Sequence, residues 1–527
     1  MKKKVQIVMT IQVFLCCNFL FAQNNSGFKK KIRFSSSKAS TSVNQIDILI
    51  RNNLKKMRIK YAGPCSDEVF VRRVFIDVLG ILPDSKELRA YFNQKGSNKR
   101  ALLIDNLLNR PEFADYWSLK WCDILRVKSE FPINLWPNAV QAYQHWIRAS
   151  IAENMPYDKF VRAMLCSSGS NFRVAPVNFY RAVQGHEPSA LARAAALSFM
   201  GTRLDKWPES KRVQMEKFFS RVAFKGTAEW KEEIVYLNPE PAKDLHAVFP
   251  DGKKVTIHAA QDARAVFANW LISPDNPWFA RAVVNRIWAW LFGRGIIHEP
   301  DDIRDDNPPV HPMVLDYLEK ELVKSNYNLR HIYRLILNSQ TYQQSCVPAT
   351  DNKDASKVFA CYMVRRLDAE VLIDALCKIT GTRESYSSAI PEPFTFVPEE
   401  HRSVELYDAS ITSQFLEMFG RPARDTGFFA ERNNKPTSAQ RLYLLNSSHI
   451  QNKITRSPRI KGIIRSAKKN RNQLIRRIYL HILCRYPDQN EMEYVRKYFR
   501  TSRLNQTQAV ADLVWALINT KEFLYRH

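Results

Sequence analysis

The sequence predicts a mainly α-helical protein in two parts, with a small β-element near residues 226–260 and a duplicated helical module at the two ends. Three observations lead to this prediction. Glycine is scarce, at 15 of 527 residues, so the tight turns that β-sandwiches, propellers and nucleotide-binding loops require are few. Apolar residues recur at helical spacing over most of the chain, whereas 226–260 reads as extended. Apolar residues make up 45% of the chain, which excludes a largely disordered protein.

Residues 1–22 have the features of a Sec signal peptide. Three lysines, at positions 2 to 4, precede an apolar stretch that is too short and too polar to span a membrane. We expect cleavage near Ala22 and a flexible polar lead-in over 23–42. The mature protein is then expected in the periplasm, secreted or at the cell surface, without a transmembrane segment. Cleavage removes three lysines and lowers the formal charge from +27 to +24.

Residues 43–225 are predicted to form the first helical domain. Six apolar residues between positions 70 and 79 fall on one face of a helix. Pro83 and Asp84 end that helix, and Glu87 lies three residues after Asp84, as in a capping box that starts the next helix. Further helices are expected at 101–108 and 113–127.

The next predicted unit, 226–260, is a β-rich bridge. Strands are expected at 233–237 and 255–258, and Phe-Pro-Asp-Gly at 249–252 indicates a turn. A second helical domain then follows over 261–470, in which 381–410 is irregular and proline-rich. Its helices are predicted at 263–271, 278–292, 312–324, 329–338 and 367–380.

The C-terminal module, 471–527, is predicted to repeat 67–117. Five of fourteen positions are identical between 71–84 and 475–488, and both stretches contain Arg-Arg and end in Pro-Asp. Downstream, a closing helix that ends in Glu-Phe recurs, with six identities in thirteen between 101–113 and 511–523. Chance similarity of amphipathic helices is the alternative. Two related modules favour binding or assembly surfaces over one catalytic cleft.

The sequence contains no recognisable catalytic motif. It lacks the Gly-x-Ser-x-Gly elbow, His-Glu-x-x-His, a phosphate loop and a dinucleotide fingerprint. Seven cysteines follow the signal segment, an odd and dispersed set without a Cys-x-x-Cys pair, so neither a disulfide framework nor a zinc site is predicted. No cofactor is expected. The seven are Cys65, Cys122, Cys166, Cys346, Cys361, Cys377 and Cys484.

One polar cluster, at 298–311, is a candidate metal site. Carboxylates and histidines on one loop are suited to a hard cation, and the carboxylate excess favours calcium over zinc. The alternative is structural, because Asp and Pro form turns and cap helices. The alternative function, a glycan-directed and metal-assisted hydrolase, would use this cluster. The candidate ligands are His298, Asp301, Asp302, Asp305, Asp306 and His311.

A basic segment is the second candidate site. Ten residues between 452 and 477 are Lys or Arg, and none is Asp or Glu. Such a segment attracts anionic polymers, and for a secreted protein an anionic polysaccharide or a cell-surface protein is the expected partner, not nucleic acid. A solvated basic linker is the alternative. The candidate anion-binding residues are Lys453, Arg456, Arg459, Lys461, Arg465, Lys468, Lys469 and Arg471.

Aromatic runs at 116–121 and 278–290 contain five tryptophans: Trp117, Trp121, Trp278, Trp288 and Trp290. They fall within helical patterns. We therefore expect these rings to pack in the core and not to form platforms for sugars.

Several motifs resemble those of the paired bacterial domains of unknown function 1549 and 1553, seen in planctomycetes and allied bacteria and often linked there to cytochrome-type domains. The first domain is similar at 70–83, 107–117 and 155–162. The second is similar at 268–288, 292–297, 300–302, 311–318, 365–370, 420–426 and 436–447. The resemblance implies an extracytoplasmic helical protein and no particular reaction.

One departure bears on cofactors. Many relatives carry a Cys-x-x-Cys-His-x-His-Pro stretch just before Asp-x-Trp, whereas residues 199–207 here contain neither Cys nor His. Covalent haem is therefore not expected. The sequence favours a non-catalytic binding or scaffolding protein, and the hydrolase and a redox partner of c-type cytochromes stay open as alternatives.

Overall fold

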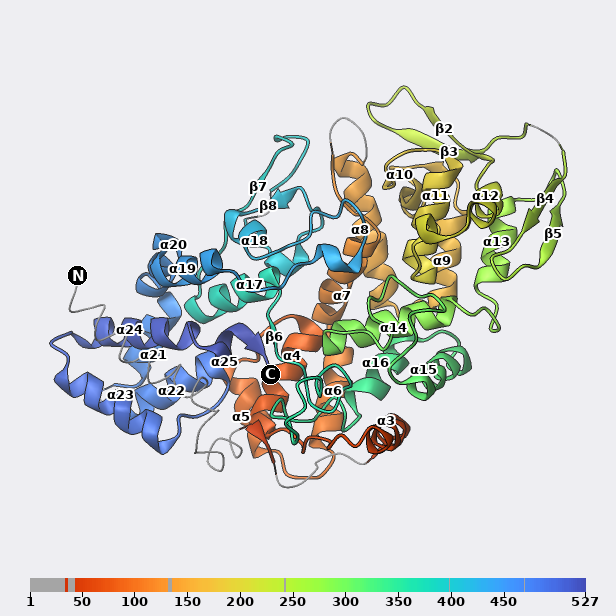
Figure 1. The fold of residues 1–527 in the computed structure, drawn as a ribbon. Coiled ribbons are helices and arrows are strands. Elements are labelled where there is room, and N and C mark those ends of the chain that lie inside the picture. Colours follow the sequence, from red (N-terminus) through yellow and green to blue (C-terminus); the bar gives the residue numbers. More distant parts are fainter. Residues whose placement is uncertain (1–33, 37–42, 131–134, 241–242, 398, 469) are drawn as a thin grey trace.

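The computed structural model describes residues 34–36, 43–130, 135–240, 243–397, 399–468 and 470–527. The fold is mainly α-helical and has two parts, which confirms the predicted fold class (Figure 1). The predicted signal peptide lies outside the described residues, as does most of the lead-in. In the described part of the chain, no helix is both long and apolar enough to cross a bilayer.

The first part is a set of helices that packs around two buried segments, α4 and α7. Helix α4 begins at the N-cap Ser66 and ends at Gly80, whose left-handed conformation (φ 65°) favours glycine. The helices are α3 (Gln45–Lys56), α4 (Asp67–Leu79), α5 (Ser85–Asn93), α6 (Lys99–Leu108), α7 (Pro111–Ile124), α8 (Pro137–Ala152), α9 (Tyr157–Cys166), α10 (Asn178–Arg181), α11 (Pro188–Ala195) and α12 (Glu209–Lys217). Single turns are η2 (Ala175–Val177), the π-helical η3 (Ala196–Met200) and η4 (Leu204–Lys206).

Two small antiparallel sheets include the predicted β-element: β3, β4 and β5 lie within 226–260, whereas β1 comes from the first part and β2 ends at residue 226 (Figure 1). One has three strands in the order β1-β3-β2, and the other is the hairpin β4-β5. The turn predicted at 249–252 joins β4 to β5, and the Gly252 amide donates to the Phe249 carbonyl (2.8 Å). The strands are β1 (Gly169–Ser170), β2 (Val222–Gly226), β3 (Glu233–Leu237), β4 (Leu245–Val248) and β5 (Lys254–Ile257).

The second part is again helical, with short strand pairs between its helices. Helices α13 and α15 begin and end at the predicted residues. The helices are α13 (Ala263–Leu271), α14 (Phe279–Phe292), α15 (Pro312–Lys324), α16 (Leu329–Leu337), α17 (Ala369–Thr380), α18 (Gln414–Met418), α19 (Ser438–Asn446), α20 (Ser448–Thr455) and α21 (Pro458–Ser466). The remaining elements are β6 (Arg365–Arg366), β7 (Ser387–Ser388), β8 (Ile411–Thr412), η5 (Ser403–Glu405) and η6 (Phe429–Glu431).

The C-terminal module has the same order of helices as α4 to α7. Its elements are α22 (Arg471–Leu483), α23 (Gln489–Thr501), α24 (Gln506–Ile518), α25 (Lys521–Leu524) and the strand β9 (Tyr525–Arg526). Helix α22, like α4, ends at a left-handed residue, here Cys484 (φ 60°). Asp84 and Asp488 each cap the next helix in a capping box, with Glu87 and Glu491.

The predicted end of the closing helix needs a correction in both modules. Glu-Phe was expected to end this helix, but it lies in the first turn of the following one, at 112–113 in α7 and at 522–523 in α25. The reason is local. Pro111 takes the first position of α7 and Thr520 caps α25, so each begins a new helix before Glu-Phe.

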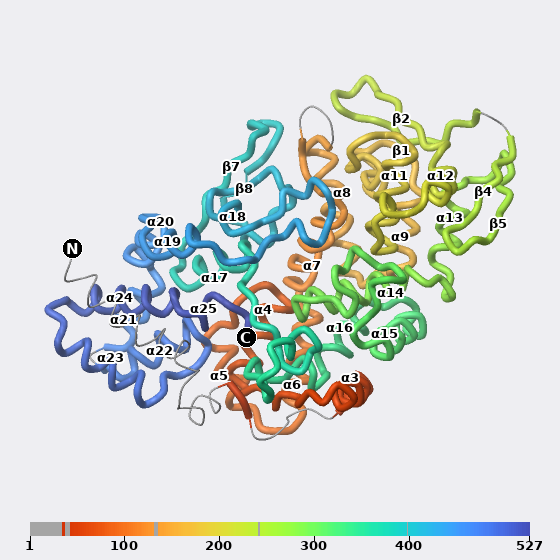
Figure 2. Tube along the Cα trace, in the orientation of Figure 1, coloured from red at the N-terminus to blue at the C-terminus, as the bar shows by residue number. Residues whose placement is uncertain are grey.

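The C-terminal residues lie at the centre of the molecule, beside α4 (Figure 2). Strand β9 pairs antiparallel with β6. Two arginines of α4 bind this end of the chain: Arg72 donates to the Phe523 carbonyl (2.7 Å), and Arg73 donates to the His527 carbonyl (2.8 Å). The C-terminal module is therefore joined by hydrogen bonds to the first and second parts.

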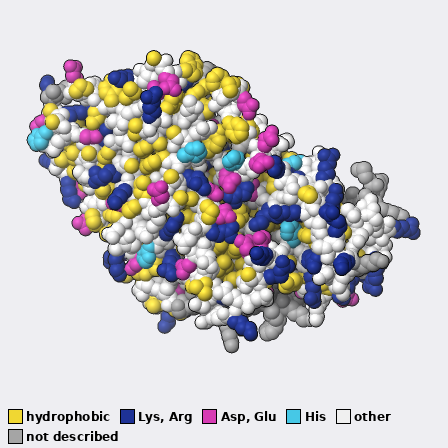
Figure 3. All heavy atoms as spheres, turned by 180° about the vertical axis from the view of Figure 1, so that it is seen from behind, with side chains coloured by type: hydrophobic (Ala, Val, Ile, Leu, Met, Phe, Trp, Pro, Cys, Tyr) yellow, Lys and Arg dark blue, Asp and Glu magenta, His cyan; other side chains and the backbone are white. Residues whose placement is uncertain are grey.

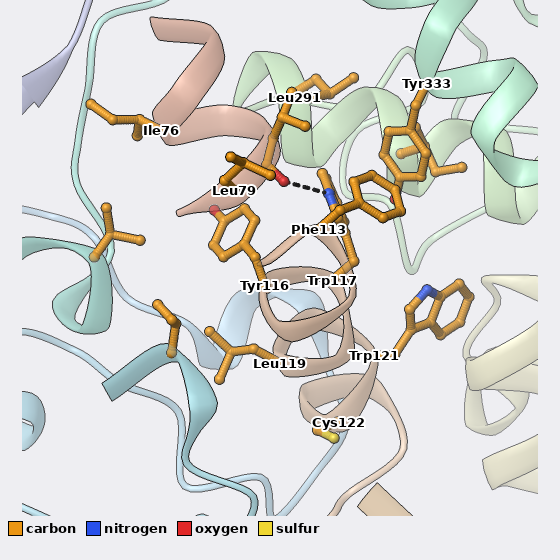
Figure 4. Packing of buried hydrophobic residues seen from close by; sticks show 14 of the residues in the cluster. Ile76, Leu79, Phe113, Tyr116, Trp117, Leu119, Trp121, Cys122, Leu291 and Tyr333 are labelled. Carbon is orange, nitrogen blue, oxygen red and sulfur yellow. Dashed lines mark hydrogen bonds between the residues drawn. The ribbon is translucent and has the colours of Figure 1, made fainter. Parts of the chain in front are cut away.

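The aromatic runs form part of the core, as predicted (Figure 4). The Trp117 and Trp121 rings are 2% exposed, and each lies 5.6 Å from the ring of Trp290 on α14. The Trp117 indole also donates to the Val78 carbonyl of α4 (3.1 Å). Helix α7 thus packs between α4 and α14, and aromatic burial joins the two parts.

Candidate functional site

The 298–311 loop is held by contacts inside the protein. Asp301 is 1% exposed and accepts hydrogen bonds from the Arg286 guanidinium (2.9 Å) and from the Phe429 amide. The ring nitrogens of His311 contact the side-chain amide of Asn53 (2.8 Å) and the Val358 carbonyl (2.9 Å). Burial lowers the pKa of His311. Both side chains therefore attach the loop to its neighbours.

Of the other four candidate ligands, Asp302 and Asp306 share a partner, the Arg304 guanidinium (3.3 Å to each). His298 lies 3.2 Å from Glu299, and Asp302 lies 3.1 Å from the Lys206 ammonium. Asp306 pairs with Arg304, and Asp305 is exposed. Among the described residues, which include all six candidates, no group of three or more His, Cys, Asp or Glu could hold a metal ion. The six candidate ligands are therefore not gathered around one point of the described structure.

The segment 199–207, where many relatives carry the haem-attachment stretch, packs against the same loop. The Ile303 amide donates to the Gly201 carbonyl (2.9 Å), and the Lys206 ammonium donates to Asp302 (3.1 Å). Gly201 has φ 60°, and a Cβ on it would lie 3.0 Å from the Pro300 carbonyl oxygen. A side chain at position 201 would therefore collide with the loop, which favours glycine there.

A buried network of charges lies where α4, α7, α17 and β9 meet. Arg526 donates to Asp77 (2.8 Å) and to Asp368 (2.8 Å). The Lys120 ammonium lies 2.7 Å from Asp368, and the Tyr116 hydroxyl donates to the same carboxylate (3.1 Å). All five side chains are buried, and they come from both parts of the fold and from the C-terminal module.

The network continues along α7 and the segment that follows α18. The Arg432 guanidinium donates to Asp123 (2.7 Å) and to Glu370 (2.7 Å). Arg424 donates to the other oxygen of Asp123 (3.0 Å). Asp368 binds Arg526 and Lys120, and Glu370 binds Arg432. Because Asp368 and Glu370 flank the start of α17, this short stretch connects the two groups of charges.

The electrostatics indicate a structural role for the network. Burial disfavours the charged form of Asp368, but the Lys120 and Arg526 cations outweigh it and hold the pKa of that carboxyl well below its usual range. Burial lowers the pKa of Lys120 to about 8. Each charge has a partner inside the protein, as a buried charge requires. The network therefore holds the parts together.

The sequence did contain a signal for this network. The motifs at 365–370 and 420–426, which carry the family resemblance, place several charged residues in largely buried surroundings. The pattern could not show which acid meets which base, because the partners lie far apart in the chain.

The predicted basic segment folds into parts of α20, α21 and α22. Arg456, Lys461, Arg465, Lys468 and Arg471 are exposed around the turns that join these helices, and we call these five residues the basic face. Lys461 and Arg465 are four apart on α21, so they lie on one side of that helix. Ile460 of α21, Ala467 at its C-cap and Leu474 of α22 are buried.

Three predicted anion-binding residues do not belong to the basic face. The Lys453 ammonium is buried, lies 3.0 Å from Glu384 and donates to the Arg383 carbonyl (2.6 Å). Arg459 is exposed too, but it is left out of the basic face because its guanidinium donates to the Lys378 carbonyl (3.0 Å). Lys469 lies outside the described residues. Seen from behind, lysine and arginine side chains are numerous over the C-terminal module, on the right of Figure 3.

Comparison with known proteins places two family matches on this architecture. Residues 45–222 match the protein of unknown function family DUF1549, and residues 263–499 match the protein of unknown function family DUF1553. No curated protein and no solved structure matches the chain. The two matches lie on either side of the sheet region, and the second extends into the C-terminal module. The chain therefore carries the paired domains of the DUF1549 and DUF1553 families.

Proposed function

We propose that this chain is a non-catalytic binding protein of the periplasm or cell surface, and that its basic face binds an anionic polysaccharide. The compartment is part of the proposal and rests on the signal-like features of residues 1–22. The observation that carries the binding role is the exposure of five cations around α21.

The charges of the basic face have no acidic partner inside the described structure. Among the described residues, no Asp or Glu forms an ion pair with Arg456, Lys461, Arg465, Lys468 or Arg471. Lys453, by contrast, is paired with Glu384. Acidic residues are also few nearby, since 452–503 contains fifteen Lys and Arg against three Asp and Glu.

An anionic polysaccharide fits this arrangement because its charges repeat along an extended chain. The cations of the basic face lie on successive turns and helix ends, so several acidic groups of one polymer could be contacted together. Each exposed contact is weak and screened by salt, and affinity comes from their number. The same reasoning predicts strong dependence on ionic strength.

The test compares two fourfold charge reversals on an immobilised polysaccharide such as a sulfated or uronate polymer. The first variant carries Lys461→Glu, Arg465→Glu, Lys468→Glu and Arg471→Glu. The matched control carries Lys211→Glu, Lys225→Glu, Lys253→Glu and Lys254→Glu, four exposed lysines of α12, β2 and the β4–β5 hairpin, on the far side of the molecule (Figure 1).

The first variant is expected to elute at roughly half the salt concentration that elutes the unaltered protein. The control variant is expected to elute at close to the same salt concentration as the unaltered protein. Circular dichroism should show that both variants keep their helices. Equal shifts for both variants would mean that net charge alone causes retention, and would contradict a role for the basic face.

A further inference from the structure

A cysteine and a lysine meet in the second part of the fold, where α17 and α20 pack against each other (Figure 1). The sulfur of Cys377, on α17, accepts a hydrogen bond from the Lys453 ammonium of α20, and Sγ and Nζ are 3.4 Å apart. All seven cysteines of the described residues are free thiols, and Cys377 alone among them has a lysine ammonium within hydrogen-bonding distance. The pair therefore brings a thiol and an amine into direct contact.

Two further contacts hold the lysine nitrogen beside the sulfur. Lys453 is 6% exposed, donates to the Arg383 carbonyl (2.6 Å) and pairs with the Glu384 carboxylate (3.0 Å). The same carboxylate lies 3.0 Å from a ring nitrogen of His449, so its own position is fixed as well. A buried side chain with this many partners keeps few of the conformations that a free lysine has. The contact between Nζ and Sγ is therefore a property of the folded chain.

The sulfur is the member of the pair that a small oxidant can reach. Cys377 is partly exposed, whereas Lys453 is buried. Burial raises the pKa of the Cys377 thiol to about 11, and the Lys453 cation acts in the opposite direction. Because the thiolate is the reactive form, oxidation of this cysteine is expected to be slow at neutral pH and faster in alkaline solution.

We propose that hydrogen peroxide links Cys377 to Lys453 through one oxygen atom, in a sulfur–oxygen–nitrogen bridge. An oxygen bonded to both atoms holds the sulfur and the nitrogen only slightly closer than they lie in this structure, and a small rotation of the flexible lysine stem supplies that approach. A direct bond between sulfur and nitrogen would require a longer movement. The inference goes beyond the binding role, because neither residue lies on the basic face.

The reaction consumes two molecules of hydrogen peroxide and forms three of water. The first peroxide oxidises the Cys377 thiol to the sulfenic acid and leaves one water. The second attacks the sulfur, displaces the hydroxyl group as water and leaves a sulfur-bound hydroperoxide. Lys453 gives its ammonium proton to solvent, and the amine attacks the sulfur-bound oxygen, so that the N–O bond forms, the O–O bond breaks and the last water leaves. The sulfur and the nitrogen each lose two electrons.

The bridge changes both the charge and the connectivity of this region. A nitrogen bonded to oxygen is a much weaker base than a lysine amine, so the bridged nitrogen carries no charge at neutral pH and no longer pairs with Glu384. The bridge also joins α17 to α20 covalently and limits the conformations of the unfolded chain between residues 377 and 453, which stabilises the folded state. Oxidation is thus expected to fasten α20, which ends next to Arg456 of the basic face, onto α17.

The experiment treats the chain from residue 23 onward with hydrogen peroxide at about pH 9 and examines its peptides by mass spectrometry. The peptides that contain residues 377 and 453 are expected as one linked species, heavier than the two together by about 14 Da, one oxygen more and two hydrogens fewer. A thiol reductant should separate them again into free thiol and free amine. The midpoint of thermal unfolding should rise by several degrees in the linked protein.

Two variants and one control show whether this pair is responsible. Cys377→Ser and Lys453→Arg should each abolish the linked species, and Lys453→Arg keeps a cation beside Glu384, so the loss is not caused by an unpaired buried carboxylate. The control Cys166→Ser, which removes another partly exposed cysteine, should keep the linked species. Recovery of Cys377 only as free thiol or sulfinic acid, with Lys453 unmodified, would overturn the proposal, and so would a link that lacks the extra oxygen.

Discussion

The guanidinium of Arg432 joins Asp123 on α7 to Glu370 on α17, two carboxylates that are far apart in the chain. A planar group with five donors can serve two carboxylates at once, whereas a lysine ammonium could not keep the same geometry. Arg526 does the same for Asp77 and Asp368. At the scale of single residues, arginine is therefore the side chain that links the helices of the two parts.

His527 gives a prediction about pH. Its ring is buried edge-on against Phe34, with ring centres 5.4 Å apart, and burial, with Arg72 acting in the same direction, lowers its pKa from 6.5 to about 4. The unfolded chain then binds a proton below pH 6.5 that the folded chain does not. Folding stability from this residue is present above pH 6.5 and is lost as pH falls toward 4.

The variant His527→Phe keeps an aromatic ring and removes the titration. Between pH 7 and pH 4 it should lose less stability than the unaltered protein, by up to about 3 kcal/mol. Urea unfolding at a series of pH values measures this difference. Parallel stability curves for the two proteins would show that this histidine does not titrate as described.

Residue-scale prediction from the sequence succeeded for side chains whose role follows from local pattern and failed for those whose role follows from distant partners. The tryptophans at 117 and 121 were placed in the core by helical spacing. The capping pair of Asp84 and Glu87 was likewise predicted from a four-residue window. Lys453, however, belongs to the basic segment by sequence but forms a buried ion pair with Glu384.

The repeated module shows at the scale of elements what a shared sequence pattern preserves. Both copies keep the left-handed end of the first helix, the Pro-Asp break and the capping box. In each copy one arginine pairs with the capping-box glutamate and with the glutamate of Glu-Phe. The arginine is Arg110 in the first copy and Arg485 in the second, and these are not equivalent positions.

The two arginines differ in exposure, which predicts different costs of removal. The Arg485 side chain is 8% exposed, whereas that of Arg110 is 29% exposed. Arg485→Met leaves Glu491 and Glu522 without their shared partner in a buried place, and is expected to cost about 3 kcal/mol. Arg110→Met should cost about 1 kcal/mol, because solvent screens its glutamates. Urea unfolding compares them, and equal costs would contradict this assignment.

Element-scale prediction worked where hydrophobic periodicity and caps agree. Helices α13 and α15 each begin at a clear signal, the N-cap Asp262 and Pro312 respectively, and both were predicted to the residue. The pairing of β6 with β9 could not be predicted, because two-residue strands have no periodicity.

At the scale of the whole molecule, three segments of the chain meet around one buried set of charges. Helices α4 and α7 come from the DUF1549 domain, the start of α17 comes from the DUF1553 domain, and β9 comes from the end of the C-terminal module. Arg526 contacts side chains from the first two of these segments. It is therefore the residue whose removal should most directly loosen the C-terminal module from the rest.

Replacing Arg526 by methionine leaves the carboxylates of Asp77 and Asp368 buried with one cationic partner fewer each. The expected loss of stability is about 3–5 kcal/mol. Because Arg526 lies on β9, the strand that pairs the end of this module with β6, local opening of the module should become more frequent. Hydrogen–deuterium exchange should therefore accelerate in 471–527 more than in α8 and α9. Arg503→Met, at an exposed position between α23 and α24, is the control. Uniform acceleration over the whole chain would instead mean that the three segments unfold as one cooperative unit.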